Sequence, residues 1–320
     1  MADSEGFPYP PRKDGYVDCL TPSQENALKE LCKRLPATLD IFSAEHLTLW
    51  GVPLADLVHP QQSQQPKEGS DTATDAAAAA AGGAAAPAPA PTAAPANGGG
   101  DAGSGPSRAQ RVVLLKFLRA RQWHVAAALT QLVNCLKWRR DFDVAGLSSE
   151  TFPQQLAAAG QLSGRDRAGN PVTYNYYGTD VDLQSVLSGP GGVASFVRWR
   201  VKLMEQAVAL LEFEGGIEHV MQVHDYSGAS MFRMDAQMKT ASREIIKLFQ
   251  DNYPEMLSAK LFLNVPVVME FLFSLFTTFS DVNTRAKFTM ASPQRSRPLL
   301  LRYIDPVQLP ERYRSEADDK

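Results

Sequence analysis

The sequence predicts an α/β protein in which a helical module precedes a mostly parallel β-sheet flanked by helices. From residue 170 onward, short strand-like segments alternate with longer amphipathic segments. Strands separated by helices of this length indicate βαβ units, whose parallel strands are joined by right-handed crossovers. Before this alternation, residues 108–142 have helical spacing only, which predicts the separate helical module.

The beginning of the chain predicts a small helical segment followed by an insertion. Residues 23–49 carry leucines at helical spacing before a proline that interrupts the pattern, namely Leu28, Leu31, Leu35 and Pro36. Between residues 59 and 107 the chain consists largely of Gln, Ala, Gly and Pro. Such a composition buries too little area to offset the entropy of ordering, so we expect a disordered insertion there.

The helical module and the alternating region follow the insertion. The first helix of the module presents Leu114, Leu115 and Leu118, and the second presents Leu129, Leu132, Val133, Leu136 and Trp138. Strands are then expected at 170–178, 219–226, 259–266 and 285–292, with helices at 195–214, 235–253 and 267–279. The predicted units are a helical segment at 1–58, the insertion at 59–107, a helical module at 108–150, the α/β domain at 151–314 and an acidic tail at 315–320.

Composition narrows the function classes. The formal net charge of -3 and the absence of a long Lys/Arg run exclude the electrostatic footprint of a nucleic-acid-binding protein. Three widely spaced cysteines, Cys19, Cys32 and Cys135, predict neither a disulfide framework nor a metal site, and favour a reducing compartment. The N-terminus lacks a secretory signal pattern. The apolar stretch at 261–276 is too short and too interrupted to span a membrane.

Several motifs together resemble one known family. They are FLRARQWHVAAALTQLVNCLKWRRDF, DNYPEMLSAKLFLNVP, and DVNTRAKF followed by LPERY. In order and spacing they are similar to the CRAL-TRIO (Sec fourteen-like) lipid-binding and lipid-transfer proteins, across residues 108–313. The resemblance implies a CRAL-TRIO fold, in which the sheet and its helices enclose an apolar pocket. Within the family, VTYNYYG, VRWRVKLMEQAVALLEFE and QVHDYSGAS followed by FRMD are most similar to the fungal subfamily called Sec fourteen homologue five, known both for haem binding and for non-classical phosphatidylinositol transfer.

The stretch QVHDY contains the first candidate site. A strand there would place Gln222, His224 and Tyr226 on one face, because successive side chains alternate. This pattern alone favours a hydrogen-bonded His–Tyr pair over a metal site. The resemblance instead implies a haem b site formed by Tyr177, Arg200, His224, Tyr226 and Lys260. Tyr226 would bind the iron as a phenolate, and His224 would either hydrogen-bond that ligand or bind the iron itself. The two cations would compensate phenolate or propionate charge.

A second candidate site is implied for a lipid headgroup. The resemblance assigns inositol phosphate binding to Arg121, Glu255, Thr284 and Lys287. Cations with several donors suit a phosphodiester, and a carboxylate with a hydroxyl suits inositol hydroxyls. Without the resemblance, Arg121 and Lys287 would be interpreted as surface cations, and Glu255 as a residue that follows a proline at a helix end.

Two further features bear on the lipid. Relatives that also carry phosphatidylcholine have small hydroxyl residues where this chain has Val220 and Gln222, so we expect no phosphatidylcholine transfer, because a buried choline phosphate would lack polar partners. The apolar helix expected at 267–279 is similar to the family's gate. Its phenylalanines cannot all lie on one face, so part of it would meet lipid, membrane or pocket; a helix buried on most sides is the alternative.

The sequence therefore predicts a carrier and not an enzyme. It would bind and transfer phosphatidylinositol, bind haem b through Tyr226, and act in phosphoinositide homeostasis or oxidant stress. Its partners would be phosphatidylinositol, a membrane surface and a lipid kinase, and a homodimer is left open. The resemblance implies the cytoplasm and the periphery of endoplasmic reticulum or microsomal membranes. Two alternatives stand beside this interpretation: a haem enzyme with peroxidase- or catalase-like activity, and a non-catalytic lipid-sensing interaction module.

Overall fold

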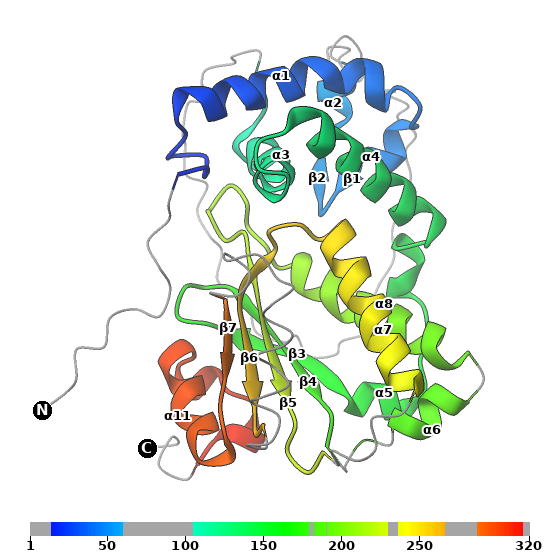
Figure 1. Cartoon of the computed structure of the whole chain (residues 1–320), viewed down its shortest axis with the longest axis vertical. Coiled ribbons are helices and arrows are strands. Elements are labelled where there is room, and N and C mark those ends of the chain that lie inside the picture. The colour runs from blue at the N-terminus through cyan, green and yellow to red at the C-terminus, as the bar shows by residue number, and fades with distance from the viewer. Residues whose placement is uncertain are drawn as a thin grey trace, which may run out of the picture.

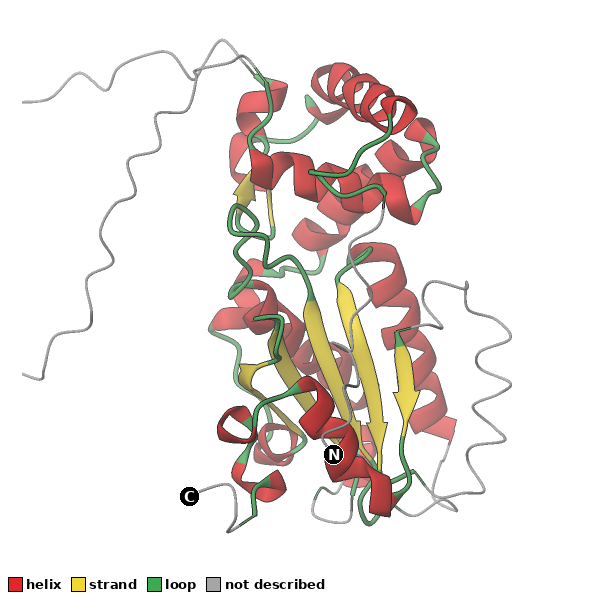
Figure 2. Ribbon diagram, turned by 90° about the vertical axis from the view of Figure 1, so that its left-hand side faces the viewer, coloured by secondary structure: helices red, strands yellow, loops and turns green. Residues whose placement is uncertain are grey.

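A computed structural model of the chain has a helical module stacked on a sheet domain (Figures 1 and 2). The helical module consists of α1 (Pro22–Leu39), α2 (Ala55–Val58), α3 (Arg108–Ala120), α4 (Val125–Asp141) and the small hairpin of β1 (Thr48–Leu49) and β2 (Val52–Pro53). The structure describes residues 14–59, 105–178, 181, 183–189, 191–229, 236–265 and 287–315.

Capping and burial explain the two long helices that open the module. Thr21 and Ser107 each form a capping box with a glutamine three residues on, which satisfies backbone donors of the first turn. Helix α1 continues through Pro36, at which the sequence predicted an interruption. Leu35 and Leu39 are fully buried on either side of that proline, so packing outweighs the lost backbone hydrogen bond.

Helix α3 is buried on nearly every side. Residues 112–118 are all 1% exposed or less, including Lys116. The helix packs on α1 and α4 on one side. On the other side it reaches the segments that precede two strands of the sheet domain, because the Lys116 side chain donates to backbone carbonyls there.

The sheet has five strands in the order β3-β4-β5-β6-β7. Strand β3 is antiparallel to β4, and the other neighbours are parallel, which confirms the predicted mostly parallel sheet. The strands are β3 (Gly160–Arg165), β4 (Pro171–Tyr176), β5 (Val220–Asp225), β6 (Leu257–Leu263) and β7 (Phe288–Met290). The parallel strands begin at the end of the sheet that faces the helical module (Figure 2).

Helices lie on both faces of this sheet (Figure 1). One face carries α7 (Gly192–Val208), which packs on α8 (Ala236–Asn252) and contacts β3 and β4. The other face is covered by α11 (Pro293–Tyr303) and the 3-10 turn Glu311–Tyr313, whose Tyr313 stacks on Tyr174 of β4. The remaining short helices are α5 (Gln154–Ala158), α6 (Leu183–Ser188) and the 3-10 turns Ala44–His46, Ala145–Ser148 and Pro306–Gln308.

The predicted elements are found with shifted ends. The helix expected at 195–214 is α7, which ends at Val208, because the chain then turns and forms a bridge between Glu212 and Ile217. The strands expected at 170–178, 219–226, 259–266 and 285–292 are β4, β5, β6 and the short β7. Strand β3 and helix α11 were not predicted from the sequence.

Several predictions fall outside the described residues. These are the apolar helix expected at 267–279, Thr284, most of the insertion at 59–107 and most of the acidic tail. None of the helices within the described ranges is long and apolar enough to cross a membrane.

Candidate functional site

Three of the predicted haem residues come together on the face of the sheet that α7 covers. Strand register pairs Asn175 with His224, so Tyr177, two residues beyond Asn175, lies on the same face. The Tyr177 hydroxyl is 3.0 Å from His224 Nδ1. Its ring stacks on His224 at 5.7 Å and on Tyr226 at 5.0 Å between ring centroids. His224 and Tyr226 therefore share one face of the strand, as predicted. The hydrogen-bonded pair expected there was His224 with Tyr226, but the structure bonds His224 to Tyr177 instead.

Two cations face these rings. Arg200 projects from α7 and is only 4% exposed, while Lys260 of β6 is partly buried. The Arg200 guanidinium lies 5.9 Å from the ring centre of Phe249, and the Lys260 ammonium lies 5.5 Å from that of Phe262. Within the described part of the chain, no carboxylate forms an ion pair with either cation. Among the described residues, the site therefore holds positive charge that no carboxylate compensates.

Burial and these two cations shift the pKa values of the side chains in the site. Burial, reinforced by Lys260 and Arg200, holds the pKa of His224 well below its usual range, so the imidazole is neutral. Burial lowers the pKa of Lys260 to about 7, and Arg200 adds to the effect. Burial raises the pKa of Tyr226, and only the opposing Arg200 favours the phenolate. Without a ligand, Tyr226 is thus a neutral phenol.

The neutral histidine has a defined hydrogen-bonding role. Burial also raises the pKa of Tyr177, so this phenol keeps its proton and donates it to His224 Nδ1. The imidazole proton is then on Nε2, which lies 3.5 Å from Gln222 Oε1. The Gln222 amide in turn points at Met204 Sδ, 3.8 Å away. His224 is therefore oriented by both of its ring nitrogens.

A carboxylate behind the sheet fixes the end of β5, where Tyr226 begins the following turn. The Asp225 carboxylate accepts hydrogen bonds from the Ser227 amide at 2.8 Å, the Asn264 side chain at 2.6 Å and the Tyr313 hydroxyl at 2.6 Å. The Tyr226 amide donates to the Leu263 carbonyl at 3.0 Å. These bonds hold the backbone that presents the Tyr226 side chain.

Two of the predicted headgroup residues meet at the opposite end of the sheet, where the parallel strands begin. Lys287 Nζ lies 3.2 Å from Glu255 Oε2, and each side chain is about a quarter exposed. Burial alone would raise the pKa of Glu255, but Lys287, Arg119 and Lys116 outweigh burial and lower it. Glu255 is therefore an ionised carboxylate surrounded by more positive than negative charge.

The arginine predicted for the headgroup site, Arg121, is not the arginine that the structure places near Glu255. Arg121 caps the C-terminus of α3, and its side chain is exposed. No contact joins it to Glu255 or Lys287 within the described residues. Arg119, two positions earlier, lies instead beside the site: its guanidinium is 3.8 Å from the Glu218 carboxylate and 4.3 Å from the ring centre of Tyr16. Thr284, the fourth predicted residue, is not among the described residues.

Two cations near this end were not singled out by the sequence analysis: Arg119 and the fully buried Lys116. A lysine within the apolar run VVLLKFL was the available signal, because a charge inside such a run must find partners once the helix is buried on all sides.

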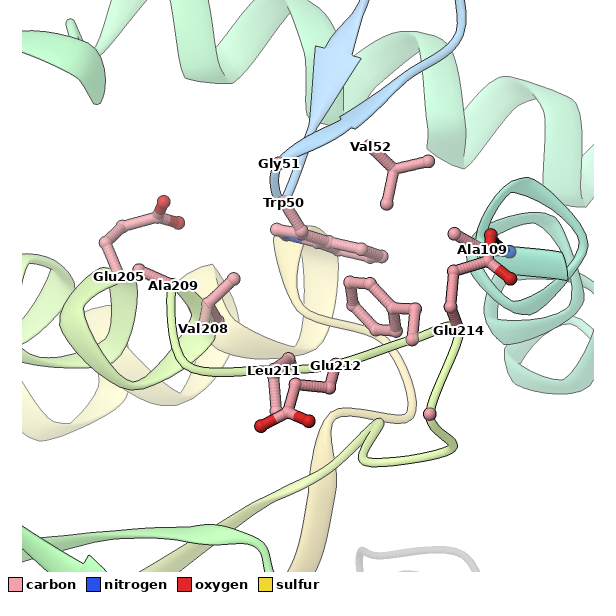
Figure 3. A pocket seen from close by; sticks show the side chains of 12 residues that line it. Trp50, Gly51, Val52, Ala109, Glu205, Val208, Ala209, Leu211, Glu212 and Glu214 are labelled. Carbon is pink, nitrogen blue, oxygen red and sulfur yellow. Dashed lines mark hydrogen bonds between the residues drawn. The ribbon is translucent and has the colours of Figure 1, made fainter. Parts of the chain in front are cut away.

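A separate hollow of about 680 Å³ lies between the β1–β2 hairpin and the loop after α7 (Figure 3). Trp50 and Gly51 form the turn of that hairpin, both with positive φ, and the Trp50 indole lies across the hollow. Glu205, which lines it, is bound by Arg139 at 2.7 Å. None of the predicted site residues lines this hollow.

Two models of one protein family match the chain. The CRAL/TRIO domain model matches residues 158–314, and the model of the CRAL/TRIO N-terminal domain matches residues 105–134. Together they match more than half of the chain.

Individual relatives agree with these family models. The chain is 36% identical over 220 residues to the phosphatidylinositol transfer protein SFH5 of Meyerozyma guilliermondii, covering 64% of each chain. It is 35% identical over 208 residues to Patellin-6 of Arabidopsis thaliana, covering 63% of this chain and 50% of that protein. The match thus spans between half and two thirds of the length of these relatives. A crystal structure of Sfh5 is similar with a TM-score of 0.62 and 28% identity, covering 84% of this chain and 80% of that one.

Proposed function

The chain belongs to the CRAL/TRIO family, and from this premise we propose that it binds phosphatidylinositol and transfers it between membranes. The observation that carries the proposal is the ion pair of Glu255 and Lys287, partly exposed and backed by the positive charge of Arg119 and Lys116. Similarity to a protein named as a phosphatidylinositol transfer protein supports it.

The chemistry of the pair suits an inositol phosphate. Lys287 would exchange part of its contact with Glu255 for a phosphodiester oxygen, and the Glu255 carboxylate would accept hydrogen bonds from inositol hydroxyls. Arg119 supplies positive charge beside the pair, a contribution that the prediction assigned to Arg121. Transfer of this kind makes and breaks no covalent bond, so the proposed activity requires no catalytic residue.

The headgroup assignment is tested by vesicle-to-vesicle transfer of labelled phosphatidylinositol. Glu255→Gln and Lys287→Met should each lower the transfer rate about tenfold, because each removes a hydrogen bond to a charged group. Glu244→Gln and Lys239→Met, on the exposed part of α8, are the matched controls and should transfer normally. Normal transfer by the Glu255 and Lys287 variants would reject the site.

The same assay addresses lipid selectivity. Val220 is fully buried, and Gln222 is engaged with Met204 and His224. Neither offers a free hydroxyl to a choline phosphate, so we propose transfer of phosphatidylinositol without transfer of phosphatidylcholine. Peripheral binding to cytoplasmic membrane surfaces, and presentation of the lipid to a kinase, belong to the same proposal.

A second proposed activity is haem binding at the aromatic site. The donor set fits the group. Tyr226 is a phenol whose hydroxyl makes no hydrogen bond within the described chain, and no carboxylate of that same part of the chain pairs with Arg200 or Lys260. Bound haem would supply a ferric iron that favours a phenolate, and two propionates that the cations would compensate. Tyr177 and Gln222 would keep His224 neutral and oriented.

The absorption spectrum of protein purified after expression with a haem supply tests this second activity. A Soret band is expected, and Tyr226→Phe should abolish or shift it. Tyr303→Phe, in α11 on the other side of the sheet, is the control and should leave the band unchanged. A Tyr226→Phe spectrum identical to that of the wild type would remove Tyr226 as the ligand.

A further inference from the structure

The most completely buried charge among the described residues belongs to Lys116 of α3, whose side chain is 0% exposed. Its ammonium donates to the Glu218 carbonyl at 2.6 Å and to the Glu255 carbonyl at 2.9 Å. These carbonyls belong to the segments that lead into β5 and β6. One side chain of the helical module therefore holds the starts of two central strands of the sheet domain.

The surroundings of Lys116 are nearly balanced in charge. The Glu218 and Glu255 carboxylates attract the ammonium, with Glu218 Oε2 at 3.9 Å, while Arg119 and Lys287 repel it. Two short hydrogen bonds to carbonyls and a neighbouring carboxylate are the partners that a buried ammonium requires. A neutral amine would keep donors for the carbonyls but would lose the charge that strengthens each bond.

The backbone of Glu255 is strained at the residue whose carbonyl binds Lys116. Glu255 has φ of 52°, a left-handed conformation that costs a non-glycine residue about 1–2 kcal/mol. The residue that carries this strain, Glu255, accepts the hydrogen bond from Lys116. Release of the carbonyl would let the backbone relax toward negative φ, and the carboxylate would then turn away from Lys287.

We propose that Lys116 is a positioning residue for the headgroup site: by binding the Glu255 carbonyl from the helical module, it aims the Glu255 carboxylate at Lys287 and at the inositol ring. The proposal rests on the phosphatidylinositol function proposed above. Lys116 touches no lipid itself, because it is fully enclosed by protein.

The same geometry makes the headgroup site responsive to pH. Burial lowers the pKa of Lys116 to about 7, against the opposing attraction of Glu218. Arg119, Glu255 and Lys287 are the other charged groups that face it. Below pH 7 the ammonium holds both carbonyls with charge-assisted bonds; as pH rises through 7, these become weaker neutral bonds. Binding of an anionic headgroup nearby adds negative charge and favours the protonated form, so transfer should be fastest at the acidic side.

The test is a double-mutant cycle read out by transfer of labelled phosphatidylinositol between vesicles. Lys116→Met and Glu255→Gln should each lower the rate about tenfold, and the double variant should be no slower than Glu255→Gln alone, because Lys116 acts through Glu255. Wild-type transfer should fall severalfold from pH 6 to pH 8.5, and Lys116→Met should show no such step. Lys137→Met, at an exposed position of α4, should behave as the wild type.

A second variant distinguishes loss of the positioning role from loss of folding. Lys116→Gln keeps an amide donor for one carbonyl and has no titrating group, so it should transfer at an intermediate rate without a pH step. A pH step that persists in Lys116→Gln, or multiplied losses in the double variant, would overturn the positioning role. If Glu255→Gln is impaired while Lys116→Met transfers normally, the positioning role fails and the headgroup site stands. Normal transfer by both variants overturns the headgroup site as well.

Discussion

The sheet has charged residues at the start of its parallel strands and along one face, and the two groups are organised in opposite ways. At the start of the strands, Lys116, Glu218, Glu255 and Lys287 compensate one another with distances between 3.2 and 3.9 Å. On the face, Arg200 and Lys260 lie against aromatic rings and have no carboxylate partner among the described residues. In the first arrangement each buried charge has an opposite charge nearby; in the second, no carboxylate of the described residues balances the two cations.

Because of this difference, removal of a charged side chain should affect stability in opposite directions at the two places. In the compensated cluster, loss of one partner strands a buried charge, which is costly. At the site of Arg200 and Lys260, the folded protein already bears the free-energy cost of burying positive charge. Removal of one of these cations should therefore stabilise the chain and weaken binding of an anion.

The largest effect is expected for Glu218→Gln. This change removes the carboxylate nearest to Lys116 and leaves only the Glu255 carboxylate against the repulsion of Arg119 and Lys287, so the free energy of unfolding should fall by about 3 kcal/mol at pH 6. At pH 9 Lys116 is neutral, and the loss should be smaller. Urea denaturation at both pH values measures it, with the exposed Glu244→Gln as control. An equal loss at pH 6 and pH 9 would contradict the charge argument.

An effect of the opposite sign is expected for Lys260→Met. The folded state lowers the pKa of Lys260 from 10.5 to about 7, so between those values the unfolded chain binds more protons and stability rises with pH. Below pH 7 the cost of the buried charge is fully present. The variant should gain about 1–2 kcal/mol at pH 6 and progressively less toward pH 10. Thermal melts across this range test the trend, and destabilisation at pH 6 would contradict it.

The smallest effect is expected for His224→Phe. Loss of the bond to Tyr177 should cost about 1 kcal/mol at pH 7. The pKa of His224 in the folded protein lies well below 6.5, so below pH 6.5 the unfolded chain binds a proton at this residue that the folded protein does not bind. The stability of the wild type therefore falls as pH drops below 6.5. The variant should lack this part of the acid destabilisation. Urea denaturation at pH 5 and pH 7 gives the comparison, and an unchanged pH slope would count against a neutral His224.

Burial explains why two central strands were predicted and an edge strand was missed. Strands β4 and β5 are buried along their whole length and were found from sequence, because continuous burial leaves an apolar pattern. Strand β3 was missed because it is an edge strand, mostly of intermediate exposure, with Gln161, Ser163 and Gly164 in its middle. Helix α11 was missed because Pro298 and several arginines obscure its short apolar face.

The candidate sites divide along similar lines. Alternation in a strand placed His224 and Tyr226 correctly, since side-chain direction follows from sequence. The choice between Arg119 and Arg121 could not be made this way, because it depends on where α3 ends and on which side of the helix meets the sheet domain. The role of Lys116 depends on carbonyls that are 102 and 139 residues away in the chain, and no local pattern records such a partner.

Those long separations govern the order in which the protein can be assembled. A chain still being synthesised completes α3 well before Glu218 and Glu255 exist, so Lys116 has no carbonyl to bind at that stage and must stay in water. Docking of the helical module therefore waits until the starts of β5 and β6 are in place, and contacts of such high sequence separation form slowly. The side of α3 that carries Lys116 is thus made early and buried late.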